Sequence, residues 1–283
     1  MDASGISTAL IAHAALLKFS VLLLLLAAFL LAEHLRPHRL LPSANKRRGT
    51  NLLLAGIASA SAAALVWAVP ALAAVFLADW AAQQNVGALH WLAANSHSSG
   101  WRASLEIIVT LIALDFAIYW QHRFSHQVPM LWRLHRVHHS DTEFDVTLGL
   151  RFHPGEIVLS LLYKSSVVLL LGAPVIAVVI YELVLMSMAL FTHANITLPN
   201  RLEQIVGRWL VTPELHRVHH SVEHADTNRN YGNWLSIWDR RFNSAAARRP
   251  DSACMPIGLP EYRAENEQTL AAILLNPLRA NAR

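Results

Sequence analysis

Two identical seven-residue runs, each carrying three histidines, dominate the chemistry that this sequence could perform. The run Leu-His-Arg-Val-His-His-Ser occupies residues 134–140 and again residues 215–221. A helix brings positions i, i+3 and i+4 onto one face, so the three histidines of each run are expected to point together. Neutral imidazole offers a nitrogen lone pair near neutral pH and is a common metal ligand. The runs therefore predict metal binding by His135, His138, His139, His216, His219 and His220.

A third histidine pair lies upstream, in Gln-His-Arg-Phe-Ser-His. Its members, His122 and His126, have the i, i+4 spacing of one helix face. The three clusters together hold eight imidazoles, whereas a tetrahedral zinc ion takes only four ligands. The count therefore predicts two metal ions. The alternative, basic surface helices that happen to be rich in histidine, does not explain why an identical run occurs twice.

The composition indicates a membrane protein. Of the 283 residues, 54% are apolar and only 15% are charged, whereas soluble domains carry about 25% charged residues. The mean hydropathy is +0.34. The single cysteine, Cys254, excludes an intrachain disulfide framework and a cysteine-based zinc site. The net charge is +4, but there is no basic stripe with interleaved aromatic residues, so we expect no nucleic-acid partner.

Several apolar segments are long enough to cross the ~30 Å hydrocarbon core of a bilayer. The first covers residues 9–32, and we expect a retained membrane anchor there; a cleaved signal peptide is the alternative. The second, residues 52–77, is expected to cross with a kink at Pro70. The third, residues 104–120, delivers His122 and its neighbours to its polar end.

A fourth apolar tract, residues 157–191, is interrupted at Gly172-Ala-Pro174, which predicts a tight helical hairpin. Because a hairpin crosses the membrane twice, the second and third histidine clusters meet on one side. The basic loop at residues 33–51 is cytoplasmic by the positive-inside rule, which places the amino terminus outside. The predicted fold is an all-α integral membrane bundle of about three transmembrane helices plus a hairpin, with a cytosolic histidine-rich cap.

One acidic residue lies inside the third apolar segment. Asp115 precedes His122 by seven residues, so both share a helix face. A carboxylate within a membrane segment is costly and suggests a role. We expect Asp115 to accept a ring N–H from a ligand histidine. A helix-packing hydrogen bond is the alternative.

The histidine clusters resemble the histidine boxes of the fatty acid hydroxylase/sterol desaturase superfamily of membrane di-iron oxygenases. The similarity covers roughly residues 105–245 and extends to Trp132, Arg151-Phe-His-Pro154, Asn230-Tyr-Gly232 and Trp238-Asp239. The sequence departs from the family pattern at Phe242-Asn-Ser244, where a Phe-Gly-Thr-like ending would follow. The local turn at that point is therefore not predicted.

The resemblance implies an O2-dependent oxidoreductase with two iron ions that hydroxylates, or desaturates, a C–H bond of a lipid or sterol-like substrate. It also implies a ninth ligand, His193, at the end of the hairpin's return helix. Residues expected to support the ligands are Asp115, His153, Asn195, Asn230 and Asp239, with direct ligation by His153 as an alternative. The chain then divides into N-terminal transmembrane helices (1–103), a catalytic domain (104–248) and a polar C-terminal tail (249–283).

No part of the sequence resembles a haem, flavin or dinucleotide-binding domain, so electrons must come from a separate donor, such as a ferredoxin or a cytochrome with its reductase. Four arginines beside the histidines could dock an acidic donor, brace helix ends or bind lipid headgroups: Arg123, Arg133, Arg136 and Arg217. We expect a multi-pass protein of a bacterial inner membrane with a cytoplasmic active site. The alternative function, a histidine-rich membrane metal transporter or metal-binding protein, predicts ligands in the middle of membrane helices.

Overall fold

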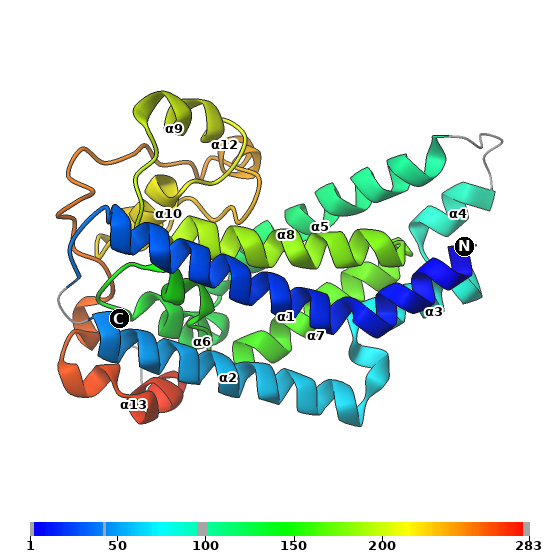
Figure 1. Ribbon diagram of the computed structural model, residues 1–283, viewed down its shortest axis with the longest axis horizontal. Coiled ribbons are helices and arrows are strands. Elements are labelled where there is room, and N and C mark those ends of the chain that lie inside the picture. The colour runs from blue at the N-terminus through cyan, green and yellow to red at the C-terminus, as the bar shows by residue number, and fades with distance from the viewer. Residues whose placement is uncertain (1–2, 42–43, 95–100, 280–283) are drawn as a thin grey trace.

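Five long helices lie side by side in the computed structural model, which describes residues 3–41, 44–94 and 101–279 (Figure 1). They are α1 (Ala3–Leu35), α2 (Ala44–Ala68), α5 (Arg102–Gln127), α7 (Pro154–Leu171) and α8 (Val175–His193). Each contains a stretch of 18 to 26 residues that is long and apolar enough to cross a membrane. Within the described residues, the expected all-α membrane bundle of three helices plus a hairpin is confirmed.

The hairpin of α7 and α8 turns where the sequence predicts. Gly172 ends α7 in the left-handed conformation, with φ 65°, and Pro174 caps the start of α8. The turn between α3 (Ala74–Gln84) and α4 (Ala88–Ala94) packs directly on it, because a Cβ at Gly87 would lie 2.2 Å from the Gly172 nitrogen. Glycine at both positions therefore allows two backbone turns to touch.

The single kinked helix predicted for residues 52–77 is wrong. The helix α2 ends at Ala68, the chain turns through a 3-10 helix at Pro70–Leu72, and α3 then packs against α7 and α8. Proline lacks the backbone N–H that a helix interior needs, and here it ends the helix. Small side chains at Ala74, Ala78 and Ala81 form the buried face of α3.

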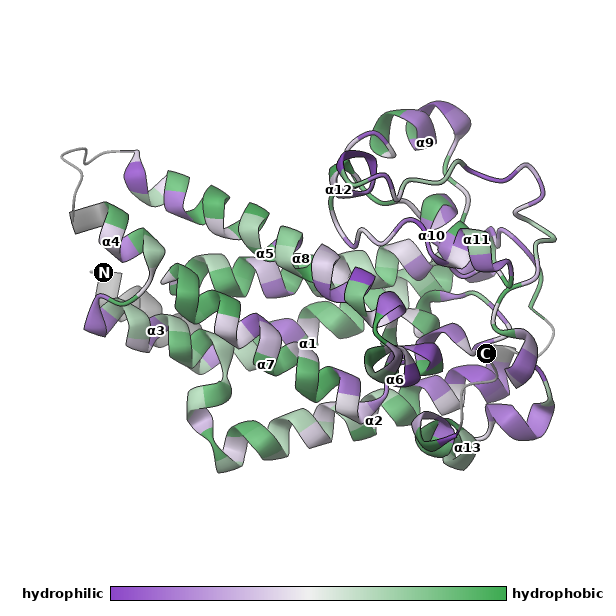
Figure 2. Cartoon of the chain, turned by 180° about the vertical axis from the view of Figure 1, so that it is seen from behind, coloured by the Kyte–Doolittle hydropathy of each residue, from purple (hydrophilic) through white to green (hydrophobic). Residues whose placement is uncertain are grey.

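Apart from α3 and α4, the short helices gather at one end of the bundle, which is its hydrophilic end (Figure 2). They are α6 (Pro129–His139), α9 (Asn200–Val206), α10 (Pro213–His219), α11 (His224–Thr227), α12 (Ile237–Arg241) and α13 (Leu270–Leu275). Short 3-10 helices occupy Val146–Leu150, Pro260–Tyr262, Glu265–Gln268 and Asn276–Leu278. The only β structure among the described residues consists of two isolated β-bridges.

The C-terminal residues 252–279 are not the solvated tail that their polarity suggests. Met255, Ile257 and Ile273 are almost completely buried, and the Asn276 side chain accepts a hydrogen bond from Arg136 Nε at 2.7 Å. This segment packs over α6, the helix of the second histidine cluster. It therefore covers the histidines from outside the bundle.

A buried ionic network fastens α1 and α2 to the loop after α6. Arg47 donates to Asp141 at 2.7 Å and also pairs with Asp145, while Arg48 donates to Glu33 at 2.8 Å. The positive-inside argument treats these arginines as free loop charges, but the structure places them in α2 and pairs them within the protein. Pairing offsets the cost of burying each charge, so the network holds two membrane helices against the histidine-bearing end.

Candidate metal centre

Nine histidines from four helices converge at the hydrophilic end of the bundle. The last turns of α5 carry His122 and His126, and α8 ends with His193. The other six come from the two repeated runs: His135, His138 and His139 on α6, and His216, His219 and His220 at the end of α10. All are buried except His122, which is half-buried. The structure thus brings together all nine residues singled out from the sequence.

The nine histidines form two groups, in each of which the ring nitrogens lie within 4.8 Å of one another. The first group holds His122, His126, His135, His139 and His219, and the second holds His138, His193, His216 and His220. The expectation that the histidines of one run point together is only partly correct. Each i, i+4 pair stays in one group, whereas His138 separates from His139 and His219 from His220.

Several Nε2 atoms face one another at short range. His122 and His219 have their Nε2 atoms 3.0 Å apart, and His193 Nε2 lies 3.0 Å from His216 Nε2, 3.1 Å from His138 Nε2 and 3.3 Å from His220 Nε2. The buried Nε2 atoms of His126, His135 and His139 have no hydrogen-bond partner among the described residues. Nε2 is therefore the nitrogen that faces another histidine in six of the nine rings, those of residues 122, 138, 193, 216, 219 and 220.

The opposite ring nitrogen fixes the tautomer of five histidines. His122 Nδ1 lies 2.7 Å from the Tyr231 carbonyl oxygen, and His219 Nδ1 lies 2.7 Å from that of Arg229. A carbonyl oxygen only accepts, so Nδ1 must carry the proton and Nε2 a lone pair. His193 and His138 have the same arrangement with the carbonyl oxygens of Ala189, at 2.7 Å, and Arg151, at 3.3 Å. His135 Nδ1 lies 2.6 Å from Glu156 Oε1.

This arrangement fits a bound metal cation in each group. The Nε2 lone pairs of His122 and His219 face each other at 3.0 Å, and two lone pairs at that distance repel unless a cation or a proton lies between them. The donor set is entirely imidazole, which suits iron, zinc, copper and nickel. Five and four ligands, respectively, are enough for one ion each. The chain can therefore hold two metal ions.

The environment keeps these imidazoles neutral. Burial, followed by the positive charge that neighbouring histidines would carry, holds the pKa values of His138, His139, His216 and His220 well below 6.5. Burial likewise lowers the pKa of His219 to about 3. Neutral imidazole is the form that binds metal, so the site is prepared for ligation over the physiological pH range.

A cavity of about 180 Å³ reaches both groups from the membrane side. Its walls include Ile118 and Gln121 of α5, Ser160 of α7 and Leu185 of α8, and it touches His122, His135, His138, His193 and His216. The Phe152 ring stacks on His138, with ring centroids 4.4 Å apart. A second cavity, of about 310 Å³, is lined by His126 together with Arg123 and His224. Two different cavities thus border the histidine groups.

The predicted roles of Asp115, His153 and Asn195 are wrong. Asp115 Oδ2 accepts hydrogen bonds from Trp238 Nε1 at 2.8 Å and Leu235 N at 3.2 Å, so it makes the packing bond that was the alternative to orienting a histidine. His153 caps α7 by accepting from Gly155 N at 3.0 Å and lies outside both histidine groups. The Asn195 amide bonds to the backbone of Arg39 instead of supporting His193.

Asn230 and Asp239 act on the loop that carries the Tyr231 carbonyl oxygen. Asp239 accepts hydrogen bonds from Tyr231 N and Gly232 N, both at 2.8 Å, and Asn230 donates to the Leu215 carbonyl oxygen at 2.9 Å. Both therefore contribute to histidine orientation indirectly. Asn243 takes the left-handed conformation, with φ 55°, at the point where the sequence departs from the family pattern. Asparagine tolerates that conformation, so the turn forms without glycine.

Glu156 is the supporting residue that sequence reasoning missed. It is the first carboxylate of α7 and is buried against the His135 ring. The signal was present, because the same argument from a carboxylate at a membrane segment applies to Glu156 as to Asp115. The backbone carbonyl partners of the other histidines have no sequence signature.

The arginines beside the histidines brace the protein interior. Arg217 and Arg136 are buried; Arg217 pairs with Glu214 at 3.0 Å, and Arg136 donates to Asn276. Arg133 donates to the carbonyl oxygen of Arg279 at 2.8 Å, and Arg123 to that of Phe242 at 3.1 Å. The helix-bracing alternative therefore describes them, and the buried pair cannot present charge to an electron donor.

Comparison with known proteins adds independent information. Residues 107–244 match the family model described as Fatty acid hydroxylase. The chain is 32% identical over 140 residues to ornithine lipid hydroxylase OlsE of Rhizobium tropici. The aligned region covers 50% of this chain and 41% of the relative. The chain is also 32% identical over 159 residues to alkylglycerol monooxygenase of Danio rerio, covering 56% and 34%. A cholesterol 25-hydroxylase-like protein of Danio rerio is 26% identical over 147 residues, covering 50% and 56%. The chain thus spans about half or less of each relative, and no solved structure gave a significant match.

Proposed function

We propose that the protein belongs to the fatty acid hydroxylase superfamily, as the match of residues 107–244 supports. On this premise it is a membrane oxidoreductase that uses O2 to hydroxylate a C–H bond of a lipid through two iron ions. The ligands are the two histidine groups, five residues in the first and four in the second. Desaturation of the same lipid is the alternative outcome of the reaction.

The observation that carries this proposal is the pair of facing lone pairs at His122 and His219. Their Nδ1 protons are held by carbonyl oxygens, and their Nε2 atoms lie 3.0 Å apart. His193 and His138 repeat the arrangement at 3.1 Å. Two adjacent, buried groups of neutral imidazoles, one group for each ion, suit a pair of iron ions.

Bound iron would supply the reduction of O2 and the oxidation of an unactivated C–H bond. Hydroxylation inserts one oxygen atom of O2 into the C–H bond and releases the other as water, and it consumes two electrons and two protons. The chain contributes orientation: the carbonyl oxygens of Tyr231 and Arg229 fix two ligand rings, and Glu156 fixes His135. Partners of this kind set ring tautomer and basicity.

The cavity beside the metal site supports a lipid substrate. Ile118, Ile157 and Leu185 give it apolar walls from three membrane-spanning helices, α5, α7 and α8. An acyl or alkyl chain from the bilayer can enter there and bring one carbon to the histidines. Gln121 and Asn233, also in the wall, offer hydrogen bonds to a polar group near that carbon.

We further propose that electrons come from a separate ferredoxin or cytochrome, and that the histidine-bearing end faces the cytoplasm of a bacterium. Arg36 of the first polar loop, which is exposed and has no salt bridge to the residues that the structure describes, supports that orientation, as does the reducing power available in the cytoplasm.

The metal-transporter alternative is less well supported. It requires ligands spaced along a route through the bilayer, whereas the nine histidines cluster at one end of the bundle, where α5 and α8 finish. Uptake of isotopic iron or zinc into vesicles that contain the protein would reveal transport.

The proposal is tested on the detergent-purified full-length protein expressed with iron supplied. The parent is compared with a His138→Ala/His219→Ala variant, which removes one ligand from each group. We expect about two irons per chain in the parent and loss of iron in the variant. Extracted lipids incubated with ¹⁸O2 and a chemical reductant should gain one ¹⁸O atom only with the parent; a new double bond without ¹⁸O indicates desaturation. Zinc that is unchanged in the variant would contradict the proposal.

A further inference from the structure

A small module beside the membrane helices carries features that the proposed oxygenase does not use. The module consists of residues 200–210 and 234–242 and includes α9 and α12, which project sideways next to the end of α8 (Figure 1). Trp238 of this module bonds to Asp115, and its ring lies 5.0 Å from that of Phe116. Asp115 and Phe116 belong to the membrane-spanning stretch of α5. The module is therefore attached beside a membrane helix and not above the membrane.

The module exposes large apolar side chains. Leu202, Ile205, Trp209 and Ile237 are 45%, 61%, 65% and 41% exposed. Soluble surfaces seldom gather residues of this size, and tryptophan is enriched where a protein meets the boundary between membrane and water. The Phe116 ring on α5 also lies 6.3 Å from the Trp120 ring and 5.0 Å from the Trp238 ring. This side of the module is thus suited to the lipid headgroup region.

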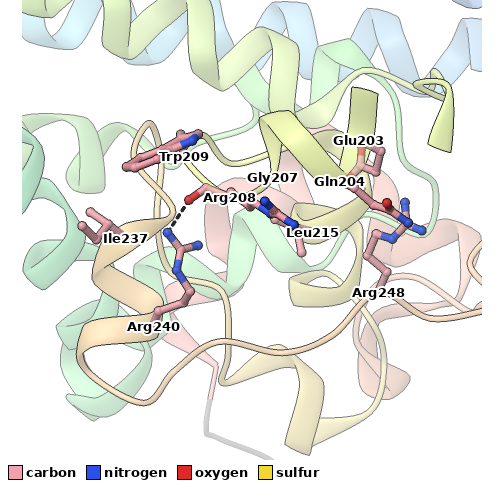
Figure 3. Close-up of a pocket in the computed structure, with 9 residues that line it drawn as sticks. All are labelled: Glu203, Gln204, Gly207, Arg208, Trp209, Leu215, Ile237, Arg240 and Arg248. Atoms are coloured by element: carbon pink, nitrogen blue, oxygen red, sulfur yellow. Dashed lines mark hydrogen bonds between the residues drawn. The ribbon is translucent and has the colours of Figure 1, made fainter. Parts of the chain in front are cut away.

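An open cavity of about 550 Å³ is sunk into this surface (Figure 3). Trp209, Leu215 and Ile237 give it an apolar lining, and three arginines, Arg208, Arg240 and Arg248, stand around it. Three arginines face a single acidic residue of the lining, Glu203, whose carboxylate already accepts a hydrogen bond from the Thr212 hydroxyl. The cavity therefore combines an apolar floor with excess positive charge.

The three arginines differ in the hydrogen bonds that their guanidinium groups already make within the protein. Arg240 donates to the Arg208 carbonyl oxygen, as the dashed line in Figure 3 shows, and to the Ser236 hydroxyl. The guanidinium groups of Arg208 and Arg248 make no hydrogen bond or ion pair with any residue that the structure describes, and both residues are exposed. Two guanidinium groups thus remain available to an anion, and arginine suits phosphate because its planar fork can donate two hydrogen bonds.

We propose that this cavity is a binding site for an anionic phospholipid of the leaflet on the metal-centre side. The headgroup phosphate binds Arg208 and Arg248, and the acyl region lies against Trp209 and Ile237. The apolar floor and the position beside α5 favour a lipid over a free phosphate or an acidic protein. The site lies outside the cavity that touches the histidines, so this proposal stands whether or not the protein is an oxygenase.

The test uses native mass spectrometry of the full-length protein, released from detergent that contains equal amounts of phosphatidylglycerol and phosphatidylcholine with the same acyl chains. The parent should retain phosphatidylglycerol in preference. An Arg208→Gln/Arg248→Gln variant should lose that preference by about fivefold for each arginine removed. An Arg201→Gln/Arg241→Gln variant is the matched control, because it removes two exposed arginines that lie outside the cavity. Equal thermal unfolding temperatures establish that the variants are folded.

Four results would overturn the proposal. Equal lipid preference in the parent and the Arg208/Arg248 variant would show that these arginines do not bind the headgroup. An equal loss in the control would show a general effect of charge. Displacement of phosphatidylglycerol by an equal concentration of glycerol phosphate would show a phosphate site that does not recognise the acyl region. A dimer mass that disappears only in the Arg208/Arg248 variant would assign the surface to a second copy of the chain.

Discussion

Glu156 Oε1 lies 2.6 Å from His135 Nδ1, and both side chains are buried. Its other carboxylate oxygen, Oε2, has no hydrogen-bond partner among the described residues. The contact joins the start of a membrane-spanning helix, α7, to the second histidine cluster on α6. A side-chain substitution can remove this contact, whereas the contacts of His122, His138 and His219 use backbone carbonyl oxygens.

Replacing Glu156 should therefore weaken metal retention without removing a ligand. We expect Glu156→Ala to lower metal affinity about 10- to 100-fold, the usual effect of losing the partner of a ligand histidine. Glu156→Gln keeps an oxygen that accepts from Nδ1 and should retain most of the metal. Metal content after dialysis against a graded series of chelator concentrations measures the difference. Equal retention in the parent and Glu156→Ala would contradict the assigned role.

His193 and His153 should behave differently, although both were candidate ligands. His193 contributes to the four-histidine group, so His193→Ala should reduce bound metal from about two ions to about one per chain. His153 caps α7 and lies outside both groups. His153→Ala should keep both ions and lower the unfolding temperature through loss of the cap. Metal analysis and thermal unfolding of the two variants, measured together, separate ligand from cap.

The metal-free protein should lose stability in acid. Burial lowers the folded-state pKa of His219 from 6.5 to about 3, and those of four other histidines shift the same way. Between these pH values the unfolded chain binds more protons than the folded one. The free energy of unfolding is therefore highest above pH 6.5 and falls as the pH drops through the window, by up to ~1.4 kcal/mol per pH unit for each histidine.

Denaturant titrations of the metal-free protein at about pH 7 and about pH 4 check this expectation. The metal-loaded protein serves as the comparison, because the bound ions hold the imidazoles neutral until protons displace them. A free energy of unfolding that is the same at both pH values in the metal-free protein would show that the buried histidines do not govern its stability.

Asp115 should matter for stability and not for metal binding. Its carboxylate accepts from Trp238 Nε1 and Leu235 N, and Asp115→Ala leaves both donors without that partner. The expected loss is about 1–3 kcal/mol of unfolding free energy. Metal content per folded chain should remain that of the parent. Loss of metal from folded Asp115→Ala protein would return Asp115 to the role predicted from its spacing to His122.

Cys254 offers a direct test of orientation. It is the only cysteine of the sequence, it is exposed, and it lies at the histidine-bearing end. A membrane-impermeant maleimide should leave it unlabelled in intact bacterial cells and label it after permeabilisation, if that end is cytoplasmic. A Cys254→Ser variant controls for other reactions. Labelling in intact cells would place the site on the outer side.

The sequence by itself determined the local parts of this protein. The length and apolarity of its segments predicted the membrane helices, and Gly172-Ala-Pro174 predicted the hairpin turn, because bilayer thickness and backbone chemistry act locally. The i, i+4 spacing predicted that His122 and His126 share a face, and both belong to one group. All three histidines of each repeated run were expected to point together, but only the i, i+4 members of each run, 135 with 139 and 216 with 220, belong to one group.

Only the tertiary structure decided how those pairs combine. Adjacent residues on a helix point about 100° apart, so His138 and His139 belong to different groups, and which histidines each meets depends on how α5, α8 and α10 pack around α6. The same holds for the supporting contacts: Glu156 reaches His135 across 21 residues of sequence, whereas Asp115, at ideal spacing from His122, bonds to Trp238. Periodicity fixes the direction of a side chain relative to its own helix, but the neighbour it meets is set by the packing of the whole bundle.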